Sequence, residues 1–178
     1  MAQKNPSLTT LKQYLKTCSK EELIGDITEL FKKFPVVKDY YQVKLNPQDN
    51  TQVAEKYKKI IKDEFFPARG FGKARLSVAR KAVNDYKKLA VNPTNIADMM
   101  LFYVEQGVKF TNAYGDIDEP FYNSMEGMYA KALELIIKCD LKDVFRLRCR
   151  GIVDDTSGIG WGFHDALGDL YDDAFDYK

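Results

Sequence analysis

Residues 94–114 form the segment that most constrains how this chain can fold. At helical spacing they carry two apolar faces with only a narrow polar strip left over. The first face holds Ile96, Met100, Tyr103, Gly107 and Phe110, the second holds Leu101, Val104 and Val108, and the strip holds Asp98, Glu105, Lys109 and Asn112. A helix that is apolar on two sides packs against other elements on two sides. The sequence therefore predicts a sandwiched central helix.

The rest of the chain also has helical spacing, and no stretch alternates apolar and polar residues as a half-buried strand does. Ser19 and Glu22 have the spacing of a capping box, and Asp118 with Pro120 marks another helix start. Short turns between helices favour antiparallel neighbours. We predict an all-α fold of about eight helices in stacked antiparallel hairpins, forming a short α-solenoid-like or irregular array.

Length and composition fit a single all-helical domain over residues 1–178, since 45% of the residues are hydrophobic. The turn "NPQDNT" makes residues 46–50 the best candidate for a subdomain boundary. The longest apolar run is "MMLFYV", which is far too short for a membrane span. Cys18, Cys139 and Cys149 form no Cys-x-x-Cys pair, which is typical of reduced thiols. We expect a cytoplasmic protein with no membrane partner.

Charge is divided unequally between the two halves of the chain. Residues 1–90 carry 19 Lys and Arg against 10 Asp and Glu, whereas residues 91–178 carry 8 against 16. Opposite charges of this kind can attract within one fold, between two copies, or toward other partners. A homodimer formed through the oppositely charged halves is one resulting prediction.

The closing stretch "DDTSGIGWGFHDALGDLYDDAFDYK" holds the only tryptophan, Trp161, and the only histidine, His164. Residues 163–176 read as an amphipathic helix with aspartates, Asp165 among them, opposite the apolar face. A helical metal site needs a second ligand three or four residues after His164, and those positions are Leu167 and Gly168. We therefore expect no metal, and a histidine that is hydrogen-bonded at the helix start or packed on aromatic rings. Asp154 or Asp155 remains an alternative neighbour for it.

The other unusual stretch is "ARGFGKARLSVARKA", which leads into a helix expected over residues 73–90. It matches neither a phosphate-binding loop nor a dinucleotide fingerprint. Arg75 falls on the apolar side of that helix, so we expect an ion pair with an acidic residue of the C-terminal half. The alternative is an anion site built from Arg69, Arg75 and the helix N-terminus. A basic face over residues 73–88 contains Lys73, Arg80, Lys81, Lys87 and Lys88.

Three strings carry a resemblance that covers most of the chain. They are "FFPARGFGKARLSVARKAV", "LFYVEQGVKFTNAYGDIDEPFYNSMEGMYAKAL" and "DDTSGIGWGFHDALGDLY". The chain resembles an uncharacterised bacterial family of domains of unknown function. The resemblance implies an all-helical, repeat-like fold and an interaction role, and it supplies no activity or catalytic residue.

Three functional hypotheses follow. The first is an intracellular protein-protein interaction or scaffolding module, with a protein partner and no cofactor. The second is a small-molecule or anion-binding enzyme near Arg75 and His164, which requires distant residues to converge. Its site residues would be Arg69, Arg75, Trp161, His164 and Asp165. The third is a nucleic-acid-binding regulator that uses the basic helix, including Arg80. No catalytic residue is identified, so we favour the first hypothesis over an enzyme.

Overall fold

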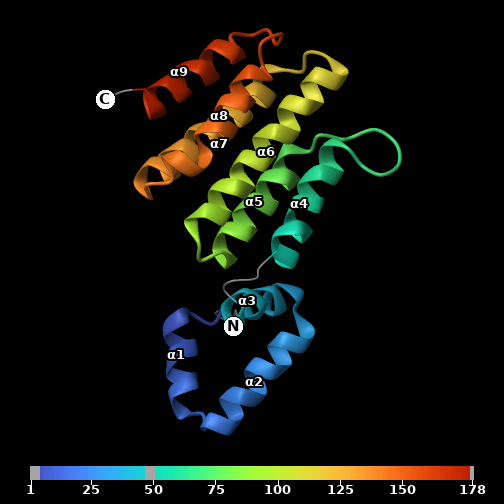
Figure 1. Cartoon of the computed structure of the whole chain (residues 1–178). Coiled ribbons are helices and arrows are strands. Elements are labelled where there is room, and N and C mark those ends of the chain that lie inside the picture. Colours follow the sequence, from blue (N-terminus) through green and yellow to red (C-terminus); the bar gives the residue numbers. More distant parts are fainter. Residues whose placement is uncertain (1–4, 47–50, 177–178) are drawn as a thin grey trace. The chain divides into compact units, whose positions relative to one another are not determined.

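The computed structural model describes residues 5–46 and 51–176, and within them it contains nine α-helices and no strand (Figure 1). They are α1 (Leu8–Thr17), α2 (Lys20–Lys33), α3 (Pro35–Leu45), α4 (Thr51–Phe65), α5 (Leu76–Leu89), α6 (Pro93–Tyr114), α7 (Glu119–Lys138), α8 (Lys142–Asp154) and α9 (Phe163–Phe175). The all-α prediction is confirmed, with nine helices in place of about eight. Most of the turn predicted at 46–51 lies outside the described residues. None of the helices in these ranges combines the length and apolarity needed to cross a membrane.

Two compact units make up the chain, Met1–Leu45 with α1 to α3 and Asn46–Lys178 with α4 to α9. We call them unit 1 and unit 2. In unit 1 the predicted capping box is present at the start of α2. The Ser19 hydroxyl accepts a hydrogen bond from the Glu22 N–H at 3.2 Å, and the Glu22 carboxylate accepts one from the Ser19 N–H at 2.7 Å.

In unit 2 the long helix α6 is the centre of the core. It contacts α4, α5, α7 and α8, while α9 lies against α7 and α8. The residues predicted for its two apolar faces are buried, except for Ile96, which is half-buried. They are Met100, Tyr103, Gly107 and Phe110 on one face and Leu101, Val104 and Val108 on the other. The sandwiched central helix is therefore confirmed.

A glycine allows α6 and α7 to approach closely. A Cβ atom added at Gly107 would lie 2.2 Å from the Sδ atom of Met125, which is fully buried on α7. Any larger residue at this position would displace that methionine. The Tyr103 and Ser124 hydroxyls join the same two helices at 2.7 Å.

Successive helices of unit 2 run in alternating directions, as expected for stacked antiparallel hairpins (Figure 1). Three of the connections therefore lie at one end of the unit: residues 66–75 between α4 and α5, 115–118 between α6 and α7, and 155–162 between α8 and α9. We call this end the loop end. It carries most of the site residues that the sequence suggested.

The helix expected from residue 73 begins instead at Leu76. Ala74 has a φ of +45°, a left-handed conformation that a helix cannot contain, and Arg75 occupies the position before the first helical residue. The apolar face of α5 is buried at Ala79, Val83 and Tyr86. Lys73 lies outside the helix, so the predicted basic face is shorter than expected.

Candidate functional site

The 66–75 connection is anchored to the end of α4 by its backbone. The N–H of Ala74 donates to the carbonyl oxygen of Glu64 at 2.8 Å. Gly72 passes so close to α4 that a Cβ atom there would lie 1.9 Å from the carbonyl oxygen of Phe65. Only glycine fits this position, and the anchored loop holds Arg69 and Phe71 in solvent.

Arg75 and Glu64 form a bidentate ion pair at the base of this loop. The Arg75 Nε atom lies 2.9 Å from Oε2 of Glu64, its terminal nitrogen lies 2.7 Å from Oε1, and its backbone N–H also donates to Oε2 at 3.3 Å. The hydrogen bonds from Arg75 lower the pKa of the Glu64 carboxyl, although burial opposes them. The Glu64 carboxylate therefore accepts hydrogen bonds from both the side chain and the backbone of Arg75, and so fixes the residue before the first turn of α5.

The predicted ion pair of Arg75 is thus confirmed, but the prediction that its partner belongs to the C-terminal half is wrong. Glu64 belongs to the N-terminal half, because α4 and α5 are adjacent helices of one hairpin. The guanidinium also lies at the helix start and is more than half exposed, so it does not lie in the middle of an apolar face. The Glu64 carboxylate thus occupies the Arg75 guanidinium, which the anion-site hypothesis assigned to an external anion.

His164 lies in the first turn of α9 and is hydrogen-bonded, as predicted. Its Nδ1 atom lies 2.9 Å from the hydroxyl of Thr156, a fully buried residue. That hydroxyl has one hydrogen, which it donates to the carbonyl oxygen of Val153 at 2.6 Å. Nδ1 must therefore donate to Thr156, which assigns the tautomer and leaves Nε2 with its lone pair when the ring is neutral. Thr156, rather than Asp154 or Asp155, is the partner.

Trp161 is held in an unusual conformation and stays exposed. Its φ is +63°, its side chain is 63% exposed, and its ring stacks on Tyr122 with centroids 6.4 Å apart. The Tyr122 hydroxyl is fixed in turn by the carboxylate of Asp116 at 3.1 Å and the hydroxyl of Thr111 at 2.9 Å. Left-handed backbone at a bulky residue costs free energy, which these contacts offset.

A chain of aromatic rings runs across the loop end. Each ring lies within 6.4 Å of the next, in the order Phe71, Tyr114, Phe110, Phe121, Tyr122 and Trp161. In the described part of unit 2, no hydrogen bond, ion pair or ring contact joins Arg69 or Arg75 directly to Trp161 or His164. The connections are therefore linked through a row of rings and not through a shared polar centre. Phe110, Phe121 and Tyr122 are the buried middle of this row, and its two ends are exposed. Among the residues that the structure describes, no cluster of three or more His, Cys, Asp or Glu could hold a metal ion.

The remaining suggested residues lie on exposed helix faces. Arg80 is exposed on α5. Asp165, in the first turn of α9, is exposed, as are the other three aspartates of that helix and Asp176, which follows it. Asp176 pairs with Arg146 at 2.6 Å. On α5, Lys81 and Lys88 both pair with Asp85 on the same helix, which reduces the positive charge of the basic face.

Sequence reasoning missed an ion network that joins α4, α6 and α8. Arg148 lies 2.6 Å from Asp98 and 2.6 Å from Glu105, and Lys58 reaches Asp98 at 2.9 Å. The polar strip on α6 was the available signal, because Asp98 and Glu105 are two turns apart on the side that α8 covers. Burial raises the pKa of Asp98, but hydrogen bonds from Lys58 and Arg148 outweigh it, and the net pKa lies below its usual value.

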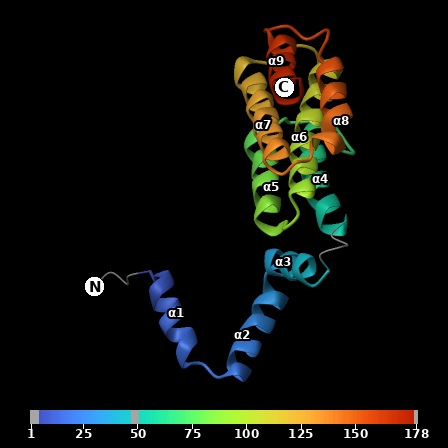
Figure 2. The ribbon, with the colours of Figure 1, turned by 60° about the vertical axis from the view of Figure 1, so that its left-hand side comes forward.

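Unit 1 presents a second candidate surface. Neither α1 nor α2 has a single buried residue. Along α2 and its C-cap residue runs an apolar row, which we call the α2 stripe and which consists of Leu23, Ile27, Leu30 and Phe34. Leu23 is half-buried and the other three are exposed. On α1 the apolar face consists of Leu8 and Leu11, which are exposed, and Leu15, which is half-buried. The two helices diverge from Cys18 and Ser19 in a V (Figure 2).

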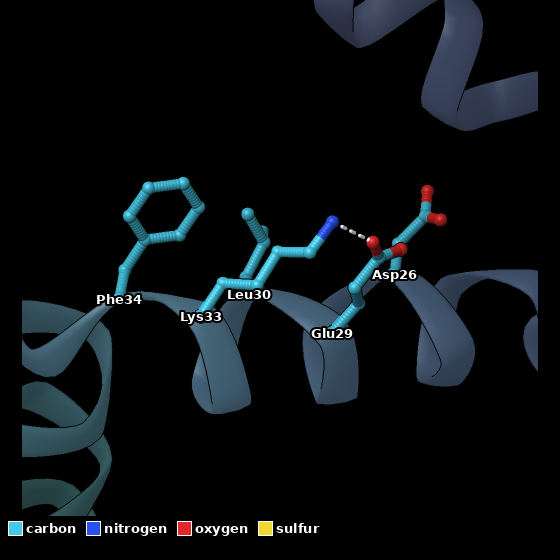
Figure 3. A pocket seen from close by; sticks show the side chains of 5 residues that line it. All are labelled: Asp26, Glu29, Leu30, Lys33 and Phe34. Carbon is cyan, nitrogen blue, oxygen red and sulfur yellow. Dashed lines mark hydrogen bonds and ion pairs between the residues drawn. The ribbon is translucent and has the colours of Figure 1, made fainter.

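A hollow of about 290 Å³ lies along one side of α2. It is lined by Asp26, Glu29, Leu30, Lys33 and Phe34, whose side chains rise on the same side of the helix (Figure 3). Lys33 is paired with Glu29 in this view. The hollow thus has two residues of the α2 stripe at its base and charged groups along its edge.

Replacing Gly72 with alanine is expected to lower the free energy of unfolding by about 1–3 kcal/mol, because the new Cβ atom collides with backbone that cannot move independently of α4. Urea unfolding followed by the fluorescence of Trp161 would measure the change. Gly158→Ala is the control, since nothing lies within 4 Å of a Cβ atom at that position. Equal midpoints for the two variants would contradict the close approach at Gly72.

The model of a family of unknown function (DUF6155) matches residues 7–176. No curated protein and no solved structure matches the chain.

Proposed function

Because the chain belongs to the DUF6155 family, whose function is unknown, its role has to be inferred from its surfaces, and we propose that it is a protein-binding module. Its binding arm is the pair of helices α1 and α2. The observation that carries the proposal is the exposure of both apolar rows, including Leu11 at 47% and Leu30 at 45%.

The physical reason for this proposal is that helices with uncovered apolar faces have little stability of their own. Helices of 10 and 14 residues are marginal in water by themselves, and most helical stability comes from packing an apolar face. Contiguous exposed apolar surface is uncommon on proteins that act alone and is typical of interaction sites. Covering Leu11, Leu30 and their neighbours would supply the hydrophobic free energy that the arm lacks.

The two alternative functions have less support. The enzyme hypothesis needs Arg75 and His164 to share a site, and their contacts are with Glu64 and Thr156. The nucleic-acid hypothesis needs an unpaired basic face, but Asp85 pairs with two of its lysines.

We also propose that the protein acts in the cytoplasm. Cys18, Cys139 and Cys149 are free thiols, which suits a reducing compartment. The bacterial origin implied by the sequence resemblance stays a prediction.

The proposal can be tested with the tagged full chain in cells that naturally produce it. We expect a protein, which could include an untagged copy of this chain, to co-purify with the wild type in a stoichiometric amount. The double variant Leu11→Asp/Leu30→Asp should recover about tenfold less of it, because a buried carboxylate in each apolar row opposes association.

Leu147→Asp is the matched control, because Leu147 is an 87% exposed leucine on α8 of unit 2. Circular dichroism should show that all three proteins keep their helices. Recovery of the same proteins, in the same amounts, with the wild type and the arm variant would contradict a binding role for α1 and α2.

A further inference from the structure

The spacing of the α2 stripe is that of a coiled-coil seam. Leu23, Ile27, Leu30 and Phe34 follow one another at intervals of four, three and four residues, which is the alternation of a and d positions in heptads. Ile27 and Phe34 take position a, and Leu23 and Leu30 take position d. These intervals read the same in both directions, so the stripe can face a reversed copy of itself.

We propose that the α2 stripe binds the α2 stripe of a second copy of this chain, with the two helices antiparallel. The inference rests on the proposed function, since it names the protein that the binding arm takes. In a two-fold arrangement centred between Ile27 and Leu30, Ile27 of each copy faces Leu30 of the other. Leu23 likewise faces Phe34, so that a smaller side chain meets a larger one at both ends.

Charge beside the stripe selects the antiparallel direction. Asp26 and Lys33 take the two g positions on one flank, and the e positions on the other flank are Ile24 and Phe31. Reversing a helix brings the same flank of both copies together, so Asp26 of each copy meets Lys33 of the other. In this register Asp26 lies level with position 31 of the other copy, two residues from Lys33. The offset along the helix axis is about 3 Å, which a lysine side chain can span. A parallel pair would instead place Asp26 beside Phe31 of the other copy, which offers the carboxylate no cation.

The surroundings of α2 leave this flank open. Helix α3 lies on the opposite flank, where the rings of Phe31 and Tyr41 are 6.2 Å apart. The hollow beside Leu30 and Phe34 is bordered by Asp26 and Lys33, and it is where Leu23 and Ile27 of the second copy would insert (Figure 3). The charges and the hollow therefore lie on the same side of the helix.

Sedimentation velocity of the purified full chain over a wide concentration range tests the inference. We expect a concentration-dependent dimer that Leu30→Asp weakens at least about tenfold, while Leu147→Asp, on the exposed face of α8, leaves it unchanged. A dimer that survives Leu30→Asp would overturn the proposal, because the interface would then lie elsewhere.

Charge exchange tests the direction of the pair. Asp26→Lys and Lys33→Asp should each weaken self-association several-fold, since each places like charges opposite one another. An equimolar mixture of these two variants should regain the dimer, because all facing g positions then have opposite charges. A mixture that associates no better than either variant alone would overturn the antiparallel arrangement.

A monomer at every concentration would also overturn the inference, and hydrogen exchange on that monomer would separate this failure from failure of the proposed function. Rapid exchange throughout α1 and α2 would show that the arm is open, so that a different protein covers it. Strong protection of α2 that Leu30→Asp removes would show that the chain covers its own stripe, which contradicts the proposed function as well.

Discussion

Replacing Phe121 with alanine is expected to lower the free energy of unfolding of unit 2 by about 3–5 kcal/mol, the usual cost of removing a buried phenylalanine ring. Phe121 is 2% exposed, and its ring lies 6.4 Å from Phe65, 6.1 Å from Phe110 and 5.5 Å from Tyr122. These neighbours come from α4, α6 and α7. The cavity would therefore open where three helices meet, and backbone shifts could close only part of it.

Urea unfolding followed by Trp161 fluorescence suits this measurement, because the only tryptophan stacks on Tyr122, the neighbour of the mutated residue. Phe71→Ala is the matched control. Phe71 is 84% exposed and belongs to the same chain of rings, so its loss should cost less than about 1 kcal/mol. Similar losses for both variants would show that the rings of the loop end are not packed as described.

Replacing Arg148 with alanine is expected to cost about 2–3 kcal/mol. The change leaves Asp98 and Glu105, two turns apart on α6, without the guanidinium of α8 that neutralises them. Removing one partner of a fully buried pair costs more, but the Arg148 side chain keeps 28% of its exposure, so water screens part of the effect. Lys58 remains to neutralise Asp98.

Arg150→Ala is the control for this variant, because Arg150 is half exposed and pairs with Asp154 one turn away on the same helix. Its loss should change the free energy of unfolding by less than about 1 kcal/mol. Equal effects of the two substitutions would contradict a structural role for the network.

Lowering the pH should reduce the difference in the free energy of unfolding between the wild type and the Arg148→Ala variant. The folded-state pKa of Asp98 lies below the usual 3.8, so its ionised form contributes stability that is present above pH 3.8 and is lost as the pH falls through the lower folded value. In the variant Asp98 has lost its hydrogen bond from Arg148, so its ionisation contributes less to stability and less is lost in acid. Unfolding free energies measured between neutral pH and pH 3 should therefore converge on the acid side, and a constant difference would contradict the assignment.

Much of the local structure could be predicted from the chain alone. The capping box at Ser19 and Glu22, the start of α7 at Asp118 and the two apolar faces of α6 depend on residues a few positions apart. The hydrogen bond of His164 at a helix start was predicted for the same reason, and only its partner, Thr156, was not. Short-range periodicity and capping are sufficient for such features.

The candidate site was predicted less well, because its contacts join separate helices. The start of α5 was misplaced since Gly72 and Ala74 are set by their contacts with the end of α4, which helical periodicity does not include. Arg75 was assigned an acidic partner in the wrong half because the attraction between opposite charges does not identify the neighbouring helix. The Arg148 network was missed because nothing near residue 148 in the sequence indicates Asp98 or Glu105.

The sequence by itself determined that the chain is helical, where most helices begin and end, and which of their faces are apolar, because these properties arise within one or two helical turns. Only the tertiary structure decided which faces are covered. It buries both faces of α6 and leaves the α2 stripe in solvent, although their residues are similarly apolar. Whether an apolar face is buried depends on which helices pack against it, and for the α2 stripe the inferred neighbour belongs to a second copy of the chain.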